Sequence, residues 1–184
     1  WPIQKEVSKL LAIVLLGIKI SFSQLASVST QSIGIVIITI LLIFLTYLAL
    51  SKLWPIQKEV SKLLAIGTSI CGVTAIMASS SVLKSKDYDV STAVLIVVLW
   101  GSLAVLIYPF FIEWYFISDL AKGIFLGVGI HDTSQVLAAA MVYSDLYQNN
   151  KVLEIATITK LLRNLFLALL VPSLFFFKNR VEKN

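Results

Sequence analysis

The stretch IGIVIITILLIFLTYLAL, at Ile33–Leu50, contains no charged side chain. Its many β-branched residues would favour a strand in water, but a lone strand in lipid leaves its backbone N–H and C=O groups unpaired. A helix pairs those groups internally, and about 20 apolar residues of helix cross a bilayer core about 30 Å thick. The stretch therefore predicts a transmembrane helix.

The composition of the whole chain agrees with a membrane environment. Of its 184 residues 58% are hydrophobic and 14% charged, and the mean hydropathy is +0.92. A soluble domain of this size has too few polar residues here to cover its surface, so the expected partner is the lipid bilayer. The basic residues are scattered and lack interleaved stacking aromatics, which argues against nucleic acid. The single cysteine cannot form an internal disulfide, and no signal-peptide cleavage site is predicted.

Hydropathy along the chain predicts an all-α membrane protein with about six transmembrane segments. They are Leu10–Leu25, Ile33–Leu50, Leu63–Leu83, Val90–Phe111, Gly123–Tyr143 and Ile155–Phe177. Short loops rich in Lys and Arg face the cytoplasm. With a cytoplasmic N-terminus the inner loops hold Lys5, Lys9, Lys52, Lys58, Lys62, Lys122, Lys178, Arg180 and Lys183, and the outer loops hold Lys84, Lys86 and Lys151. This bias predicts both termini on the cytoplasmic side of the cell (inner) membrane, with all six segments crossing.

The third segment, LLAIGTSICGVTAIMASSSVL, is interrupted by small and polar residues. Gly67 and Gly72 bracket Thr68, Ser69, Ile70 and Cys71. A glycine inside a helix costs about 1 kcal/mol relative to alanine. Two interpretations stay open: a helix packed closely through small residues, or a discontinuous helix whose freed backbone groups face a cavity.

The fifth segment, KGIFLGVGIHDTSQVLAAAMVYS, carries charge at mid-depth. Asp132 is a predicted N-cap with Gln135 as its capping-box partner, so a new half-helix begins inside the segment. Ionisable groups at such depth are expensive and functional by default. The alternative is that His131 bonds a carbonyl group and Asp132 is only a cap. Paired glycine-interrupted segments are typical of transporters.

These two interruptions predict an ion-binding site. Broken helices expose N–H groups that attract anions and carbonyl groups that attract cations. Lys160 and Arg163, three residues apart, share one helical face and would balance the charge of Asp132 or of an anionic substrate. Their alternative role is snorkelling to the headgroups, which is also expected for Lys19. His131 would couple transport to protons. The predicted ion-binding residues are Thr68, Ser69, Cys71, Gly72, His131, Asp132, Thr133, Ser134 and Gln135.

Four stretches carry a resemblance to a known family. They are VLLGIKISFSQL at Val14–Leu25, GTSICGVTAI at Gly67–Ile76, GIHDTSQVLAAA at Gly129–Ala140 and ATITKLLRNLFLALLVP at Ala156–Pro172. In order and spacing they resemble the YeiH-type sulfate exporters, the UPF0324 membrane proteins, over about Val14 to Arg180. The resemblance implies a multi-pass inner-membrane protein related to cation/proton antiporters and anion transporters, with substrate held where two discontinuous helices cross. Members of that family are much longer, which implies a fragment, and they carry Arg and Gly where this chain has Leu10 and Ala12.

The block WPIQKEVSKLLAI occurs twice without a single difference, at Trp1–Ile13 and at Trp54–Ile66. Structural repeats are usually longer and diverged. We therefore expect residues 1–13 to be a duplicated or chimeric segment, residues 14–180 a fragment of a transmembrane transporter core, and residues 181–184 a cytoplasmic tail.

The sequence thus predicts a secondary transporter, or a fragment of one, that exports sulfate or a similar small inorganic anion. Two alternatives remain: a cation/proton antiporter of the same fold, and a non-transporting, degenerate membrane protein. The chain lacks HExxH, GxSxG and any Cys/His metal-ligand spacing, so we expect no enzyme activity, metal or cofactor. A homo-oligomer is left open, as are the substrate and the direction of transport.

Overall fold

The computed structural model describes residues 22–53 and 58–181, and within these ranges all of its regular structure is helical. The helices are α2 (Phe22–Leu53), α3 (Lys58–Ser69), α4 (Val73–Leu83), α5 (Asp87–Tyr115), α6 (Asp119–Gly129), α7 (Thr133–Tyr147) and α8 (Asn150–Val181). The predicted all-α class is confirmed. The predicted duplicated segment 1–13, the first segment up to Ser21 with Lys19, and residues 182–184 of the predicted tail lie outside the described residues.

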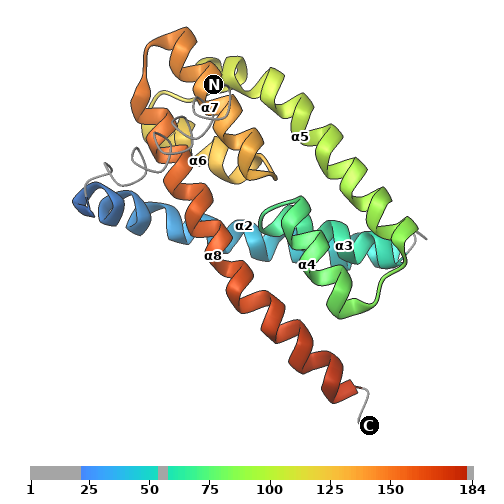
Figure 1. Cartoon of the computed structure of the whole chain (residues 1–184). Helices are drawn as coiled ribbons and strands as arrows, with labels where there is room; N and C mark the ends of the chain where they lie inside the picture. The colour runs from blue at the N-terminus through green and yellow to red at the C-terminus, as the bar shows by residue number, and fades with distance from the viewer. Residues whose placement is uncertain (1–21, 54–57, 182–184) are drawn as a thin grey trace, which may run out of the picture.

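Three long helices form the frame of the molecule (Figure 1). Helices α2 and α8 have 32 residues each and α5 has 29. At 1.5 Å per residue each is long enough to cross a bilayer core. Thr30–Leu50 in α2 and Asp87–Tyr115 in α5 are also apolar enough to be candidate membrane spans. In Figure 1, α5 and α8 run in opposite directions and α2 lies across them.

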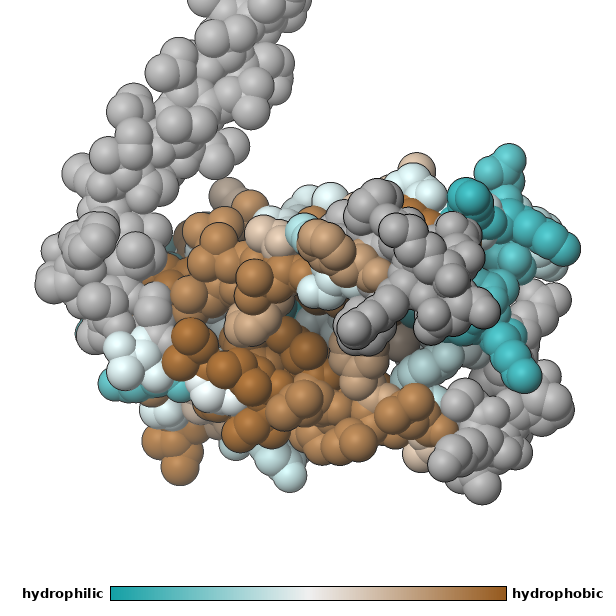
Figure 2. Space-filling model, turned by 90° about the horizontal axis from the view of Figure 1, so that it is seen from below, coloured by the Kyte–Doolittle hydropathy of each residue, from teal (hydrophilic) through white to brown (hydrophobic). Residues whose placement is uncertain are grey.

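The surface of the frame is strongly apolar. Ile38, Leu41 and Leu45 of α2 and Leu99 and Leu106 of α5 are each more than half exposed. Hydrophobic residues form a broad patch on the coloured part of the face seen in Figure 2. Soluble monomers rarely expose apolar patches of this extent, whereas lipid accommodates them. The structure therefore agrees with the prediction of a membrane protein.

Helices α3 and α4 form a first hairpin, joined by the three residues Ile70–Gly72. A Cβ atom built on Gly67 would lie 2.7 Å from Cγ1 of Ile76, so the two helices pack closely. Leu63 and Ile76 belong to one apolar cluster, against which Leu83 packs. The predicted third segment is interrupted where expected, but the chain folds back after the interruption. This is an αα-hairpin with a short loop.

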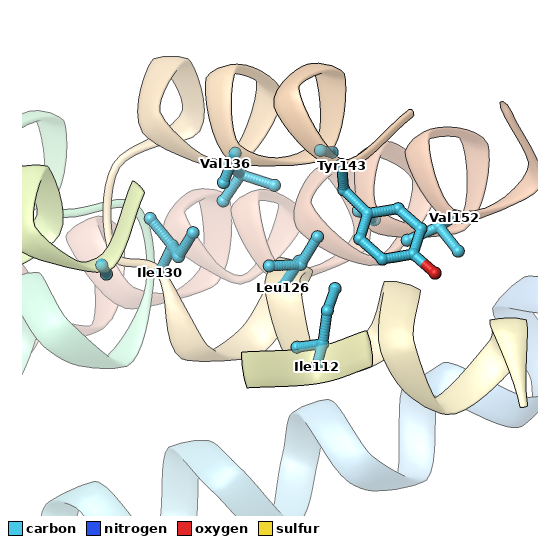
Figure 3. Close-up of a cluster of buried hydrophobic side chains, with 10 residues drawn as sticks. Ile112, Leu126, Ile130, Val136, Tyr143 and Val152 are labelled. Carbon is cyan, nitrogen blue, oxygen red and sulfur yellow. The ribbon is translucent and has the colours of Figure 1, made fainter. Parts of the chain in front are cut away.

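Helices α6 and α7 form a second hairpin, joined by Ile130–Asp132. Asn149 Nδ2 donates to Asp119 Oδ1 at 2.8 Å, so the end of α7 lies beside the start of α6. Figure 3 shows side chains of α6, such as Leu126, facing Tyr143 of α7. The prediction that the third and fifth segments run through to the opposite side is therefore wrong. In each case contacts between distant residues return the chain to the side from which it came.

The two hairpins open toward opposite ends of the molecule, and their tips lie near its middle (Figure 1). The first hairpin opens toward the end where α5 begins and α8 ends. The second opens toward the end where α5 ends and α8 begins. Helix α5 thus carries the chain from one hairpin to the other.

The predicted loop between Leu25 and Ile33 is also absent, because α2 is continuous across it. Serine and threonine cost only a few tenths of a kcal/mol inside a helix. Ser32 is fully buried there and its hydroxyl oxygen accepts a hydrogen bond from Thr159 Oγ1 at 3.2 Å. These polar residues therefore join α2 to α8 and do not form a turn.

Two glycines set the distance between α6 and α8. A Cβ atom built on Gly127 would lie 2.7 Å from Cβ of Thr159 and 2.8 Å from the carbonyl oxygen of Ala156. A Cβ atom built on Gly123 would lie 2.5 Å from Cβ of Ile155 and 3.1 Å from the carbonyl oxygen of Val152. Small residues of this kind let membrane helices approach backbone to backbone. The close contact brings the next turn of α8 against the hairpin tips.

Candidate functional site

The two hairpin tips touch each other through their backbones. Gly72, in the first tip, has φ +68° and ψ −121°, a conformation open essentially to glycine alone. A Cβ atom built on Gly72 would lie 3.2 Å from the carbonyl carbon of His131 and 3.3 Å from Cα of Asp132. Glycine is therefore needed here twice, for the turn and for the approach of the second tip.

The first tip is a tight, buried turn. The N–H of Gly72 donates to the carbonyl oxygen of Gly67 at 2.9 Å and closes the end of α3. Ser69 and Cys71 are buried. Helix α4 then begins without a hydrogen bond from any N-capping side chain. The first N–H groups of a helix have no partner inside it, and among these the N–H of Ala75 donates to the Cys71 sulfur. The helix start keeps its positive end.

The second tip is extended and is capped by a side chain. Ile130 and Asp132 both have β-region dihedrals. The carboxylate Oδ1 of Asp132 accepts from Ser134 N at 3.0 Å and from Ser134 Oγ at 2.7 Å. The predicted N-cap is confirmed, but the predicted capping box is wrong. Gln135 instead donates from Nε2 to the carbonyl oxygen of Val98 on α5 at 3.2 Å.

Two buried cations on α8 reach both tips. Lys160 Nζ donates to the carbonyl oxygens of Ile70 at 3.3 Å and Ile130 at 3.1 Å, and also to that of His131. Lys160 is 1% exposed and Arg163 is fully buried. The snorkelling alternative is therefore wrong for both residues.

Arg163 binds the same two helix ends one turn farther along α8. Its Nε donates to the carbonyl oxygen of Ser69 at 2.8 Å and its Nη1 to that of Val128 at 2.6 Å, while Nη2 donates to that of Thr68. The last carbonyl groups of α3 and α6 have no partner within their helices and form negative helix ends. Lys160 and Arg163 satisfy these groups and offset that negative charge.

The tips hold more positive than negative side-chain charge. Within the described residues the ion pairs closer than 4.0 Å are Glu59–Lys62 and Glu113–Lys122, so neither Lys160 nor Arg163 has a carboxylate partner. Asp132 is the acidic residue at the tips, and its Oδ1 is engaged with Ser134. Two cations therefore face one carboxyl group.

The hydroxyl groups predicted to hold an anion are engaged elsewhere in this structure. Thr68 Oγ1 donates to the carbonyl oxygen of Leu64 at 2.7 Å, and Ser69 Oγ donates to that of Ile66 at 2.9 Å. Each hydroxyl proton is thus directed into the preceding turn of α3. Backbone N–H groups at the starts of α4 and α7 are the donors that the tips offer to an anion.

The structure brings the predicted residues of both interruptions together at the tips, and Lys160 and Arg163 with them. Gln135 is the exception, because its amide packs against Gly101 of α5. Asn164 was missed by the sequence analysis. Its Nδ2 donates to Thr133 Oγ1 at 3.1 Å, and its buried Oδ1 has no partner among the described residues. Its position one residue after Arg163, ahead of an apolar run, was the available signal.

A second polar cluster, also missed, closes the open end of the second hairpin. Lys122, 6% exposed, donates to Glu113 Oε2 and, at 3.0 Å, to Tyr143 Oη. Tyr143 Oη donates to Glu113 Oε2 at 2.5 Å. Burial lowers the pKa of Lys122, but its hydrogen bonds to Glu113 and Tyr143 outweigh that effect and raise the pKa. Within the described ranges no group of three His, Cys, Asp or Glu side chains is placed to hold a metal ion.

Comparison with known proteins identifies the relatives of this chain. A sequence model of the family described as Conserved hypothetical protein 698 matches residues 4–184. A UPF0324 membrane protein of Streptococcus pneumoniae is 32% identical over 173 residues, which are 94% of this chain and 51% of the relative. One of Streptococcus agalactiae is 36% identical over 154 residues, 84% of this chain and 46% of the relative. One of Streptococcus pyogenes is 34% identical over 171 residues, 93% of this chain and 50% of the relative.

The chain spans about half the length of these curated relatives. No solved structure is significantly similar to it. The family match covers nearly the whole chain and includes the residues of both hairpin tips. The resemblance found in the sequence is thereby confirmed: the chain belongs to the family described as Conserved hypothetical protein 698, the UPF0324 membrane proteins.

Proposed function

We propose that this chain is part of a secondary transporter that exports sulfate or a similar small inorganic anion, bound where the hairpin tips meet. The observation that carries the proposal is the backbone contact of Gly72 with His131 and Asp132 beside the buried Lys160 and Arg163. Irregular backbone at membrane depth is tolerated where it lines a cavity or is buried in protein, and it commonly forms the substrate site of transporters.

The electrostatics of the tips favour an anion. The starts of α4 and α7 both lie at the tips and present N–H groups with positive helix ends. Asp132 already occupies the start of α7, whereas no side-chain hydrogen bond caps α4. An oxyanion at the start of α4 would therefore accept hydrogen bonds from the first N–H groups of this helix, in the field of Lys160 and Arg163. The carboxyl group of Asp132 would limit how tightly it binds.

The opposed hairpins suit a transporter in which access alternates. The two hairpins enter the middle of the molecule from opposite ends (Figure 1). A small shift of one hairpin against α8 would open the tip contact toward one side only. In this proposal His131, which lies in the second tip, is the group through which protons are coupled to transport.

The hairpins also change the expected distribution of charge across the membrane. The end of α2, the start of α3, the connection from α4 to α5 and the end of α8 lie toward one end of the molecule, and the starts of α6 and α8 lie toward the other. The sequence places Lys52, Lys58, Lys62, Lys84, Lys86, Lys178 and Arg180 in the first group of segments and Lys122 and Lys151 in the second. Basic residues concentrate on the cytoplasmic side. We therefore propose that the first hairpin and the C-terminal end of α8 face the cytoplasm and that the second hairpin faces the opposite side of the cell membrane. The cytoplasmic N-terminus remains a prediction, since it depends on the first segment.

The test is sulfate flux through a full-length relative, because this chain spans only about half of that length. The protein from Streptococcus pneumoniae would be reconstituted in liposomes and sulfate flux measured with and without a pH gradient. We expect flux that falls at least tenfold when the residue matching Arg163 is changed to Met. The matched control changes the residue aligned with Lys151, far from the tips, and keeps full flux. If sulfate does not move under either condition, the substrate assignment is wrong.

Cation/proton antiport is the second candidate, and Asp132 is the observation in its favour. A carboxyl group at a helix start competes with an anion for the same positive end. In the same liposomes this version predicts proton movement driven by a sodium or potassium gradient without sulfate. Proton flux that survives the change of Asp132 to Asn would remove its main support.

A further inference from the structure

Three backbone carbonyl oxygens converge on one point between the hairpin tips. They belong to Ile70 in the first tip and to Ile130 and His131 in the second, and we refer to them as the carbonyl cage. Oxygen ligands of this kind, aimed inward from the ends of helices or loops, are how proteins bind small cations such as K⁺. Nothing in the side chains of these three residues is needed to form the cage.

The ammonium group of Lys160 fills the carbonyl cage completely. An ammonium group has three N–H donors, and each of the three carbonyl oxygens accepts one. Its hydrogen bonds in the described part of the chain are to carbonyl groups and none is to a carboxylate. The charged or titratable groups that surround it are Arg163 on the same helix, Cys71 in the first tip, and His131 and Asp132 in the second. A buried charge without a close counter-ion is costly unless dipoles replace its hydration shell.

Lys122 provides the contrast. Its ammonium group is also buried, but it contacts the carboxylate of Glu113 and the phenol of Tyr143. Removing that ammonium group leaves a carboxylate whose side chain is 38% exposed and can take up water. Removing the ammonium group of Lys160 leaves three carbonyl oxygens without this donor, and those of Ile70 and Ile130 belong to fully buried residues.

We propose that the carbonyl cage is a monovalent-cation site shared by the two hairpin tips, and that Lys160 is a tethered cation that occupies it. When the lysine side chain is shortened, the cage takes a free small cation in its place. The occupied cage holds the two hairpins together, because its ligands come from both. This inference goes beyond the transport proposal and does not depend on which ion is transported.

The test measures the thermal unfolding of the purified full chain in detergent, in methylammonium, sodium or choline chloride at equal concentration. Methylammonium keeps three N–H donors, whereas choline has none and is too large for the cage. In choline we expect Lys160→Ala to unfold roughly 10 °C below the unsubstituted chain. Methylammonium should recover at least half of that loss. The concentration needed is on the order of tens of millimolar, because the free cation lacks the local concentration that the tether provides.

Two variants keep the result specific. Lys160→Met fills the same space with a neutral side chain, so it should lose stability without recovery in any of the salts. Lys122→Ala should lose stability to the same extent in all three salts, since no carbonyl cage forms there. The unsubstituted protein should unfold at the same temperature in all three salts, because its carbonyl cage is occupied by Lys160.

The proposal is overturned if Lys160→Ala behaves alike in methylammonium, sodium and choline, or if Lys160→Met recovers as much as Lys160→Ala. Should Lys160→Ala not fold in choline, the yield of monodisperse protein extracted in methylammonium is compared with that in choline by size-exclusion chromatography. Recovery only in methylammonium supports the proposal, and equal loss in both contradicts it. Absence of sulfate flux in the liposome experiment would leave this result unchanged.

Discussion

The two hairpin tips reverse the direction of the chain in different ways. The first turns through Gly72, whose φ of +68° is accessible to glycine, and α4 starts without a side-chain cap. The second is extended through Ile130 and Asp132, and the Asp132 carboxylate caps α7. In both, carbonyl groups at the end of the preceding helix accept hydrogen bonds from Arg163 of α8. The first tip thus depends on backbone freedom and the second on side-chain chemistry.

This difference assigns different tasks to the two tips. A helix start that is already capped has less to offer an external anion than one that is not. If the tips bind an anion as we propose, the first tip is the more open of the two, while the second carries the ionisable groups His131 and Asp132. Substitutions in the first tip should disturb folding, and substitutions in the second should disturb charge and coupling.

The largest effect is expected for Gly72→Ala. The added Cβ atom meets the backbone of the second tip at 3.2–3.3 Å, and alanine strongly disfavours this φ and ψ. These two effects should together lower the free energy of unfolding by about 3 kcal/mol, which corresponds to roughly 10 °C in Tm. Thermal unfolding of the purified chain in detergent measures it.

Gly34→Ala is the matched control for that experiment. Gly34 lies in α2, and a Cβ atom built there meets nothing within 4 Å. Alanine has the higher helix propensity, so stability should stay the same or rise by up to about 1 kcal/mol. Equal stability of the two variants would mean that the tips do not touch as described.

The interruptions themselves could be predicted from sequence because their signals are local. Gly67 and Gly72 weaken a helix wherever they occur, and Asp132 followed by a helix-forming run marks an N-cap regardless of the rest of the fold. The all-α class followed in the same way from composition and segment length. These properties need no knowledge of distant contacts.

The direction of the chain after each interruption could not be predicted, because it depends on residues far apart. The second hairpin is closed by Asp119 with Asn149 and by Lys122 with Tyr143. The count of basic residues did not expose the error. Folding both segments back moves Lys84 and Lys86 to the inner side and Lys122 to the outer side, which makes the bias stronger than before. The i,i+3 spacing placed Lys160 and Arg163 on one face, but their carbonyl partners come from other helices.

The next effect concerns the open ends of the hairpins. The second is closed by the polar cluster of Glu113, Lys122 and Tyr143, whereas the open end of the first carries apolar side chains of one cluster, such as Val60 and Leu83. Tyr143→Phe keeps the ring but removes the hydroxyl group that contacts both charged partners. We expect the free energy of unfolding to fall by about 1–2 kcal/mol. Amide hydrogen exchange should become faster in α6 and α7 and stay unchanged in α3 and α4.

Tyr88→Phe is the control, since Tyr88 is 71% exposed at the start of α5 and should tolerate the change. Equal acceleration of exchange in both hairpins would contradict the separate closure of their open ends. It would indicate that the hairpins open as one unit.

A smaller effect is expected when the cap of the second tip is removed. Asp132→Ala leaves the N–H of Ser134 without its acceptor at the start of α7. Loss of an N-cap costs about 1 kcal/mol. In detergent, the unfolding temperature of this variant should be well above that of Gly72→Ala. A reversed order would mean that the second tip, and not the first, limits the stability of the contact.

The smallest effect on stability, and the most informative for function, is expected for Asp132→Asn. Asparagine is as good an N-cap as aspartate, so the free energy of unfolding should change by less than about 0.5 kcal/mol. The substitution removes the carboxylate that opposes Lys160 and Arg163 at the tips.

If the tips bind an anion, the affinity of the solubilised chain for sulfate, measured by calorimetry, should rise several-fold in Asp132→Asn because like-charge repulsion is lost. If the site serves cation/proton exchange, the same variant should leave sulfate binding unchanged and abolish proton flux in the full-length relative. Sulfate binding that weakens would contradict both versions, since it would require the carboxylate to act in favour of the anion.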